Sequence, residues 1–273
     1  MNHGGNVWQG ASPGGWLDFS ANLRPDGPPE WVYQAMCAAI NDARYYPDVL
    51  MAEAKRGIAR YAGVPEDCVL PTSGGIAAID VAVRGQTGRV LVSPPTFSEY
   101  AALARAAGLE VSEDGFGALK TGDTAFLCNP NNPTGRALSR DTVLSIHARA
   151  FSVRARLIVD EAFIDCCPKH SVREQAAALE GLIVVGSLTK ALSVPGVRLG
   201  YLIARPEAVE EIGRQVPPWS LNAFAALIAK RLPAHLPELE ADRVRNAARR
   251  AKFEASLAAL GASVYPSEAS FLL

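Results

Sequence analysis

The sequence lacks an excess of charge of either sign, and it lacks a long apolar run. Among its 273 residues, 27 are Lys or Arg and 28 are Asp or Glu, so the formal net charge at pH 7 is −1. This balance argues against a surface built to bind nucleic acid or an anionic membrane. No stretch reaches the roughly 18 consecutive apolar residues that a membrane-spanning helix needs. We therefore expect neither a nucleic-acid nor a membrane partner.

Cysteine is scarce as well. The five cysteines are odd in number and follow no metal-ligand spacing, so we expect no metal site. The adjacent pair Cys166 and Cys167 favours reduced thiols over a disulfide, as in a reducing compartment. The first six residues have neither the basic start nor the apolar segment of a secretory signal. These features predict a cytoplasmic protein. A GxGxxG motif is also lacking, which argues against a nicotinamide-binding Rossmann protein.

What the sequence does contain is an alternation of apolar runs and helical segments. Apolar, β-branched runs predict strands, and helical spacing of apolar residues between them predicts helices. The predicted strands are 89–92, 125–128, 156–159, 182–186 and 199–204, and the predicted helices are 28–40, 50–61, 76–83, 99–107, 140–151, 221–231, 238–260 and one from Pro206. This order is typical of an α/β fold with three α-β-α layers and a mostly parallel sheet.

Short segments near both ends of the chain are also predicted to be strands. Residues 17–22 could form a short strand that ends in a polar tip, within an arm rich in Gly, Pro and Asn. Residues 262–265 and 270–273 are read as two more strands, the second of which would continue past Leu273. We therefore expect an incomplete small C-terminal domain.

Lys190 stands just past a predicted strand, in Ser187-Leu188-Thr189-Lys190. Parallel α/β sheets place their chemistry at this end of the strands. Small and apolar neighbours would strip water from the amine and lower its pKa, which makes it a competent nucleophile. The hydroxyls of Ser187 and Thr189, with Arg198 close by, suit a phosphate. The alternative is a solvated loop lysine, because lysine is seldom buried.

Three further polar stretches follow or precede predicted elements. Asp160 comes directly after an apolar strand, where a carboxylate needs a cationic partner or a proton-bearing nitrogen to bind. Residues 129–135 form a turn rich in Asn, Pro and Gly, with more amide groups than a turn needs. Ser73 and Gly74 lie in a small-residue turn before a helix, which is either an anion site or an ordinary helix cap.

Taken together, residues 129–135, 160–163 and 187–200 resemble the fold-type I pyridoxal-phosphate enzymes of the class I/II aminotransferase family. The resemblance implies that Lys190 is the Schiff-base lysine and that Asp160 keeps the pyridine nitrogen protonated. It implies that Asn132 binds the phenolic oxygen of pyridoxal phosphate and that Phe97 stacks on its ring. The phosphate-binding residues that it implies are Ser73, Gly74, Ser187 and Arg198.

The resemblance also implies a homodimer with shared active sites, in which Tyr46 reaches the phosphate of the neighbouring subunit. Without the resemblance, Tyr46 would be interpreted as an ordinary packing residue. The implied domains are an N-terminal arm and small-domain segment (1–44), a large cofactor-binding domain (45–235) and the start of a small C-terminal domain (236–273). The family's carboxylate-binding arginine would lie past Leu273.

Two features resemble the threonine-phosphate decarboxylases of cobalamin biosynthesis within this family. They are the opening His3-Gly4-Gly5-Asn6 together with 18–22, and Phe163 where many aminotransferases have tyrosine. This resemblance implies a phosphorylated amino acid as substrate, with His3 and Asn22 as contacts to it. An aminotransferase, such as one acting on histidinol phosphate, and a non-catalytic protein of the same fold are the alternatives.

Overall fold

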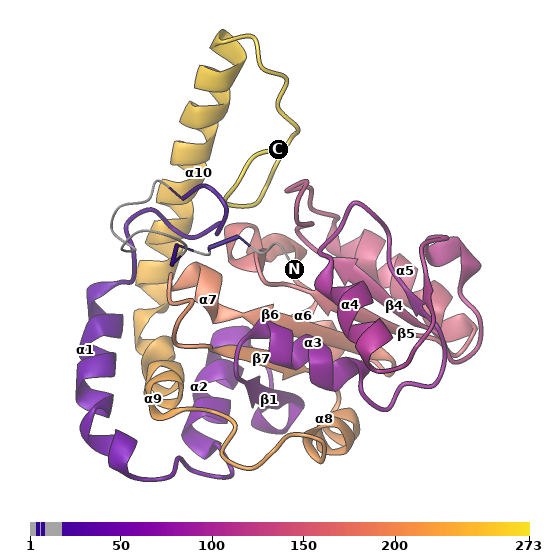
Figure 1. The fold of residues 1–273 in the computed structure, drawn as a ribbon, viewed down its shortest axis with the longest axis horizontal. Coiled ribbons are helices and arrows are strands. Elements are labelled where there is room, and N and C mark those ends of the chain that lie inside the picture. The colour runs from indigo at the N-terminus through magenta and orange to yellow at the C-terminus, as the bar shows by residue number, and fades with distance from the viewer. Residues whose placement is uncertain (1–3, 6, 9–17) are drawn as a thin grey trace.

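The computed structural model describes residues 4–5, 7–8 and 18–273, and its centre is a seven-stranded sheet (Figure 1). The strand order is β1-β7-β6-β5-β4-β2-β3. Strand β7 runs antiparallel to both of its neighbours, and the other pairs are parallel. The strands are β1 (Val69–Thr72), β2 (Val90–Leu91), β3 (Val111–Ser112), β4 (Thr124–Cys128), β5 (Arg156–Asp160), β6 (Leu182–Ser187) and β7 (Gly200–Ile203). The predicted α/β fold with a mostly parallel sheet is confirmed.

Helices cover both faces of this sheet. They are α1 (Glu30–Ala39), α2 (Ala52–Ala62), α3 (Gly75–Val83), α4 (Glu99–Ala106), α5 (Arg140–Ser152), α6 (Arg173–Ala176), α7 (Leu188–Ala191), α8 (Pro206–Gly213), α9 (Ala223–Arg231) and α10 (Leu236–Ala259). Buried side chains of α1, α2, α5, α6 and α9 form one hydrophobic cluster with the sheet, and those of α3, α4 and α8 form another. The molecule therefore has the three layers that the sequence predicts.

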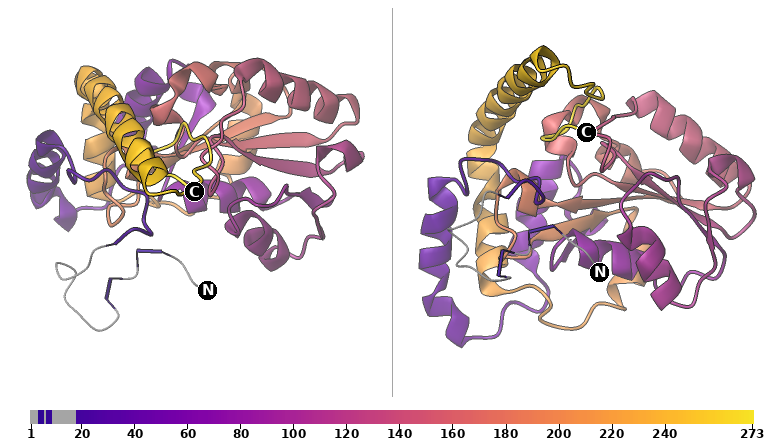
Figure 2. Two further views of the ribbon diagram at one scale, coloured as in Figure 1. Left: turned by 90° about the horizontal axis from the view of Figure 1, so that it is seen from above. Right: turned by 45° about the horizontal axis from the view of Figure 1, so that its top comes forward.

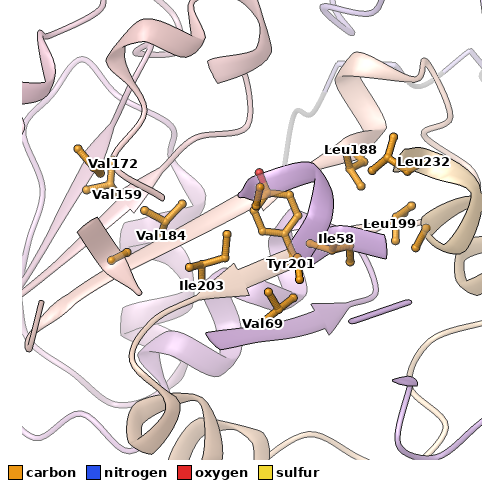
Figure 3. Close-up of a cluster of buried hydrophobic side chains, with 14 of the residues drawn as sticks. Ile58, Val69, Val159, Val172, Val184, Leu188, Leu199, Tyr201, Ile203 and Leu232 are labelled. Carbon is orange, nitrogen blue, oxygen red and sulfur yellow. The ribbon is translucent and has the colours of Figure 1, made fainter. Parts of the chain in front are cut away.

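The central strands are apolar without a break because both of their faces are buried. Along β6, Val184 belongs to one hydrophobic cluster and Ile183 to the other, because successive side chains point to opposite faces. Figure 3 shows the first cluster, in which Val184 lies near Ile203 of β7 and Ile58 of α2 is packed beside Tyr201. Each such fully buried aliphatic side chain stabilises the fold by about 1.5–3 kcal/mol. Burial on both faces thus gives the continuous apolar runs from which the strands were predicted.

Five strand assignments differ from the sequence predictions. Strands β1 and β3 were not predicted; β1 contains Pro71 and lies at an edge of the sheet, where a missing N–H is tolerated. The predicted strand at 17–22 is wrong for the described residues 18–22, since the Asp18 carboxylate accepts hydrogen bonds from the N–H and hydroxyl of Ser20 and closes a turn.

The two strands predicted near the C-terminal end are also wrong. Residues 262–265 and 270–273 are irregular, although the Tyr265 N–H donates to the Leu273 carbonyl at 2.9 Å. In Figure 1 the distal half of α10 projects from the body, and the chain then turns back toward it. The right view of Figure 2 shows the same projection. These segments therefore pack beside α10 instead of extending the central sheet.

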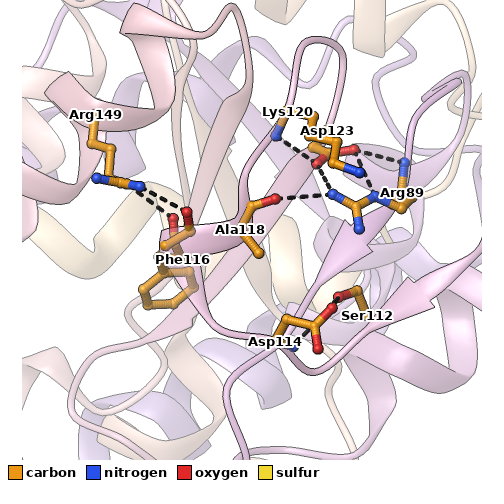
Figure 4. A network of polar contacts seen from close by, with 9 residues as sticks. Arg89, Ser112, Asp114, Phe116, Ala118, Lys120, Asp123 and Arg149 are labelled. Carbon is orange, nitrogen blue, oxygen red and sulfur yellow. Dashed lines mark hydrogen bonds and ion pairs between the residues drawn. The ribbon is translucent and has the colours of Figure 1, made fainter.

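A polar network holds the loop that leads into β4 (Figure 4). The Asp123 carboxylate accepts hydrogen bonds from the Arg89 guanidinium and from the N–H groups of Arg89 and Lys120. Burial opposes ionisation of this carboxylate, but the hydrogen bonds outweigh burial and lower its pKa. Arg149 of α5 donates to the carbonyls of Phe116 and Gly117. The network fixes the far ends of the strands, opposite to the ends at which the polar residues described next are gathered.

Candidate active site

Lys190 lies on a single helical turn, α7, that begins where β6 ends. The Leu192 N–H donates to the Leu188 carbonyl and closes this turn. The Lys190 side chain is half-buried, and its Nζ donates a hydrogen bond to the Ala21 carbonyl at 2.7 Å. The segment around Ala21 therefore comes to the same place as the amine, although the two are far apart in sequence.

The surroundings of Lys190 lower the pKa of its amine. Burial is the largest cause, and the positive charge of Arg198 adds to it, while the Asp160 carboxylate opposes both. This is the direction predicted from the small and apolar neighbours. A lower pKa leaves more of the amine neutral, and the neutral amine is the nucleophile.

A cavity of about 200 Å³ brings the predicted residues together. It is lined by six of them: Phe97, Asn132, Asp160, Ser187, Lys190 and Arg198. They come from α7, from the carboxyl ends of β5 and β6, and from the segments after β2, β4 and α7, so one edge of the sheet supplies the site.

Gly74 and Ser73 occupy the turn before α3, at the rim of this cavity. Gly74 has a φ of 85°, and a Cβ atom at this position would lie 2.6 Å from Nη2 of Arg198. Only glycine both adopts this backbone and leaves room for the guanidinium. Gly75, its neighbour, lines the cavity. Ser73 is half-buried in the same turn but is not among the lining residues.

Asp160 is held by two hydrogen bonds at the end of β5. Its Oδ2 accepts from the Tyr100 hydroxyl at 2.7 Å, and its Oδ1 accepts from the Ala162 N–H at 2.9 Å. Burial raises the pKa of this carboxyl, and the two hydrogen bonds and the charge of Lys190 only partly offset that effect. The sequence predicted a cationic partner or a proton-bearing nitrogen, but among the described residues the side chain that donates to Asp160 is the phenol of Tyr100. The carboxyl also borders the cavity, where it would stabilise a protonated nitrogen.

Tyr100 was missed by the sequence analysis. Its ring is fully buried, stacked on Phe126 at 4.8 Å and met edge-on by Phe97 at 5.5 Å between centroids. It therefore supports both the carboxyl and the aromatic ring of Phe97 that lines the cavity. One signal could have identified it, since a buried tyrosine needs a partner for its hydroxyl and Tyr100 follows Phe97 by three residues.

The three asparagines of residues 129–135 make different contacts. Asn129 exchanges hydrogen bonds with the backbone of Leu138, at 3.2 Å and 2.7 Å. Asn131 donates to the Pro95 carbonyl and to the Thr134 hydroxyl, both at 2.9 Å. Two amides thus hold the turn, and the third, Asn132, lines the cavity. This accounts for the amide group that the turn itself does not need.

The residues present fit pyridoxal phosphate. The Thr189 hydroxyl oxygen is buried and has no hydrogen-bond partner among the described residues, and Thr189 lines the cavity. With Ser187 and the Arg198 guanidinium it makes a donor set for a phosphate group. Phe97 offers an aromatic face, Asn132 an amide, and Asp160 a carboxylate for a protonated ring nitrogen. Lys190 supplies the amine.

Besides Ser73 and Gly74, two more predicted residues of the described chain, Tyr46 and Asn22, do not line this cavity. Tyr46 is 79% exposed and contacts the Trp219 ring at 4.8 Å between centroids. Asn22 has a φ of 52°, a backbone that asparagine tolerates, and it follows the Ala21 carbonyl that accepts from Lys190. His3 lies outside the described residues. The roles that the resemblance implies for these three residues remain predictions.

Phe163 closes the cavity on the side of Lys190. Its ring is buried, lies 5.7 Å from Lys190 Nζ and meets Phe271 edge-on at 5.0 Å between centroids. It has no hydroxyl to donate, so this wall is apolar. The C-terminal segment therefore reaches the site through Phe271.

The described part of the chain contains neither a metal-binding cluster nor a membrane-spanning helix. Within it, no cluster of three or more His, Cys, Asp or Glu residues could hold a metal ion. The same residues include no helix that is both long and apolar enough to cross a membrane.

Comparison with known proteins agrees with this geometry. A family described as aminotransferase class I and II matches residues 15–273. Threonine-phosphate decarboxylase from Salmonella typhimurium is 36% identical over 248 residues, which cover 82% of this chain and 68% of that protein. Histidinol-phosphate aminotransferase from Aeromonas hydrophila is 32% identical over 248 residues, which cover 84% of this chain and 69% of that protein.

Solved structures share the fold. L-threonine-O-3-phosphate decarboxylase from Porphyromonas gingivalis has a TM-score of 0.82 at 25% identity, covering 92% of this chain and 79% of that one. Histidinol-phosphate aminotransferase from Sinorhizobium meliloti, solved in complex with pyridoxal-5'-phosphate, has a TM-score of 0.81 at 19% identity, covering 92% of this chain and 73% of that one.

Proposed function

Because this chain belongs to the aminotransferase class I and II family, we propose that it decarboxylates O-phospho-L-threonine with pyridoxal phosphate as cofactor. The product would be (R)-1-aminopropan-2-yl phosphate, an intermediate of cobalamin biosynthesis. One observation carries the proposal: a single cavity gathers Lys190, Asp160, Asn132 and the donors Ser187 and Arg198. The 36% identity to a threonine-phosphate decarboxylase supports this choice of substrate.

Bound pyridoxal phosphate supplies an electron sink that stabilises a carbanion at the α-carbon of an amino acid. The chain's residues hold that group and manage protons around it. Ser187, Thr189 and Arg198 donate to the phosphate, and Asp160 holds the proton of a ring nitrogen. Tyr100 fixes the Asp160 carboxyl by donating to Oδ2.

Lys190 and Phe163 act on the substrate side. Burial and the charge of Arg198 lower the pKa of the Lys190 amine, which favours its exchange of a proton with the substrate. We assign it the return of a proton to the carbon that loses the carboxylate. Phe163 and Phe271 form an apolar wall beside the amine, which keeps water from that carbon.

Transamination is the second candidate, because a histidinol-phosphate aminotransferase is 32% identical and the same electron sink serves both reactions. A non-catalytic role for the same fold is a third. Phe163 favours decarboxylation, because the resemblance links phenylalanine here with the decarboxylases and tyrosine with many aminotransferases.

Product analysis tests the proposal. Protein loaded with pyridoxal phosphate is incubated with O-phospho-L-threonine, with and without 2-oxoglutarate, and CO2 and the amine product are measured. We expect CO2 release without 2-oxoglutarate and loss of nearly all activity in Lys190→Ala. A reaction that requires 2-oxoglutarate and releases no CO2 would establish transamination instead, and a Lys190→Ala variant as fast as wild type would reject the assignment.

We also propose that the active unit is a homodimer. Tyr46 is exposed and lies outside the cavity of its own chain, so a role at the cofactor phosphate requires a second copy. The resemblance implies that role.

A further inference from the structure

Cys128 is the last residue of β4, and it is a buried cavity residue that has no role in the proposed function. Its side chain is 5% exposed and lines the same cavity as Asp160 and Asn132. In the register of the sheet, Cys128 lies beside Asp160 of β5. The turn that carries Asn132 begins at the next residue. Cys128 is therefore a neighbour of both the carboxyl and the amide of the cavity.

The thiol of Cys128 takes part in two hydrogen bonds within this turn. Its S–H donates to the Pro130 carbonyl at 3.3 Å, and its sulfur accepts from the backbone N–H of Asn132 at 3.4 Å. Sulfur is a weak donor and a weak acceptor. Both bonds lie in a buried or partly buried place, however, where the low dielectric strengthens them. The two contacts fix the backbone that carries the Asn132 amide.

The other asparagines of the turn do not hold Asn132. The side chains of Asn129 and Asn131 contact Leu138 and Pro95, respectively. Neither contact involves Asn132, whose own side chain lines the cavity and is available to a ligand. The backbone of Asn132 therefore sets where its amide lies, and the thiol of Cys128 is the group that holds the N–H of that backbone.

The surroundings of the thiol keep it protonated at neutral pH. Burial raises the pKa of the Cys128 thiol to about 12, and the charge of Asp160 adds to this effect, while contacts with Tyr100 and the Asn132 N–H oppose it. A protonated thiol keeps its donor for the Pro130 carbonyl. It also places no second negative charge beside Asp160, where two like charges would repel.

We propose that Cys128 is a positioning residue whose thiol holds the Asn132 amide where it meets the phenolic oxygen of pyridoxal phosphate, an inference that rests on the proposed function. An amide donor at that oxygen favours its charged form. The alternative is that the thiol only fills space, since a buried cysteine behaves as a small hydrophobic residue. The two roles predict opposite responses to substitution.

Two substitutions separate these roles. Cys128→Ser keeps a donor and an acceptor in a shorter side chain, whereas Cys128→Val keeps an apolar side chain and removes both hydrogen bonds. Cys128→Ala also removes both bonds and serves if Cys128→Val fails to fold. The matched controls are Cys68→Ser and Cys68→Val. Cys68 is also buried and donates to a backbone carbonyl, that of Ala177 at 3.7 Å, but it does not line the cavity.

Amide hydrogen exchange of residues 129–135, followed by mass spectrometry without cofactor, measures the hold on the turn. We expect exchange at Asn132 to be about threefold to tenfold faster in Cys128→Val, as for the loss of one hydrogen bond. Cys128→Ser should stay within about twofold of wild type. The Cys68 variants should leave this segment unchanged.

Titration with pyridoxal phosphate at a series of pH values, followed by visible absorbance, measures the consequence at the site. We expect Cys128→Val to weaken the cofactor about threefold to tenfold. The pH at which the absorbance of the bound cofactor changes should rise, because a displaced amide no longer favours the charged phenolic oxygen. Cys128→Ser should resemble wild type in affinity and pH profile, and so should both Cys68 variants.

Two results would overturn the inference: a Cys128→Val variant with the exchange, affinity and pH profile of wild type, or a Cys128→Ser variant as impaired as Cys128→Val in all three. Failure of the proposed function is a separate result, because neither measurement uses a substrate. If wild type releases no CO2 from O-phospho-L-threonine while Cys128→Val still weakens the cofactor and Cys128→Ser does not, the positioning role stands and the decarboxylase assignment falls.

Discussion

At the scale of single residues, the site depends on groups that hold its reactive side chains. Tyr100 donates to Asp160 across 60 positions of sequence, and its ring supports Phe97. Of the causes that act on the Asp160 carboxyl, the Tyr100 hydrogen bond is the largest that lowers its pKa. Tyr100 is thus a positioning residue for the carboxyl that faces the ring nitrogen.

Replacing Tyr100 with Phe removes this hydrogen bond and keeps the packing. The pKa of Asp160 should then rise further, because a hydrogen bond to the charged form is lost. We expect the affinity for pyridoxal phosphate to fall about tenfold, in line with a lost hydrogen bond to a charged group, and the pH dependence of the bound cofactor's absorbance to shift toward higher pH.

Cofactor titration across pH makes this measurement, and the half-exposed Tyr33→Phe serves as the control. A Tyr100→Phe variant with unchanged affinity and an unchanged pH profile would show that the hydroxyl does not position Asp160.

Sequence motifs could predict Lys190, Asp160, Asn132 and Arg198 because each stands beside a strand end or in a distinctive turn. They did not predict that Tyr100 donates to Asp160. The two residues are distant in sequence and become neighbours only when α4 packs on the sheet. The sequence around Tyr100 indicates that its hydroxyl needs a partner, but not which residue that partner is.

At the scale of elements, a buried ionic cluster joins four pieces of the fold. Arg173 of α6 pairs with Glu161, which follows β5, through Nε at 3.2 Å. Its guanidinium also lies 4.7 Å from the centroid of the Tyr61 ring on α2 and 5.6 Å from that of Tyr201 on β7. Glu161 accepts further hydrogen bonds from the Ser171 hydroxyl and the Val172 N–H, both at 2.7 Å. This cluster locks the segment that follows Asp160.

Arg173→Met should destabilise the protein by about 3–5 kcal/mol, because it leaves the buried Glu161 carboxylate without its cation. Urea unfolding of wild type and variant measures the loss. Arg205→Met is the matched control, because Arg205 forms exposed ion pairs with Glu180 and Glu207 and should cost less than about 1 kcal/mol. Equal stability of Arg173→Met and wild type would mean that the cluster does not hold these elements together.

Element predictions succeeded where an apolar run is continuous and failed where the run is short or interrupted. The apolar runs of β4, β5 and β6 and the cap of α5, where Ser139 accepts from the Thr142 N–H, follow from local sequence. The edge strand β1, with Pro71, has no such run. Residues 262–265 have an apolar pattern like that of a strand, but they pair with none of the strands of the described sheet.

At the scale of the whole molecule, apolar side chains gather outside the cavity. The loop between α1 and α2 exposes Tyr45, Tyr46 and Leu50 by 61%, 79% and 71%, and Trp219, from the loop between α8 and α9, packs against Tyr46. Clustered exposed aromatic and aliphatic side chains mark interaction surfaces. A second copy of the chain is the partner that the shared-site proposal requires.

We expect the loaded protein to sediment as a dimer of twice 29.0 kDa, and Trp219→Glu to shift it toward monomer and lower its activity. The control Phe151→Glu changes an aromatic residue of similar exposure, 50% against 48%, on α5. Sedimentation equilibrium over a range of concentrations measures the fraction of dimer in each protein. A monomer with full activity would rule out shared sites.

In the proposed function, Lys190 and its cavity hold pyridoxal phosphate, which reacts with a phosphorylated amino acid. Visible absorbance of the purified protein with pyridoxal phosphate, before and after O-phospho-L-threonine is added, tests it most directly. We predict a cofactor band in wild type that shifts on addition of the substrate, and loss of that band in Lys190→Ala. A wild-type protein with no band, or a Lys190→Ala variant with the same band and the same shift, would contradict the claim.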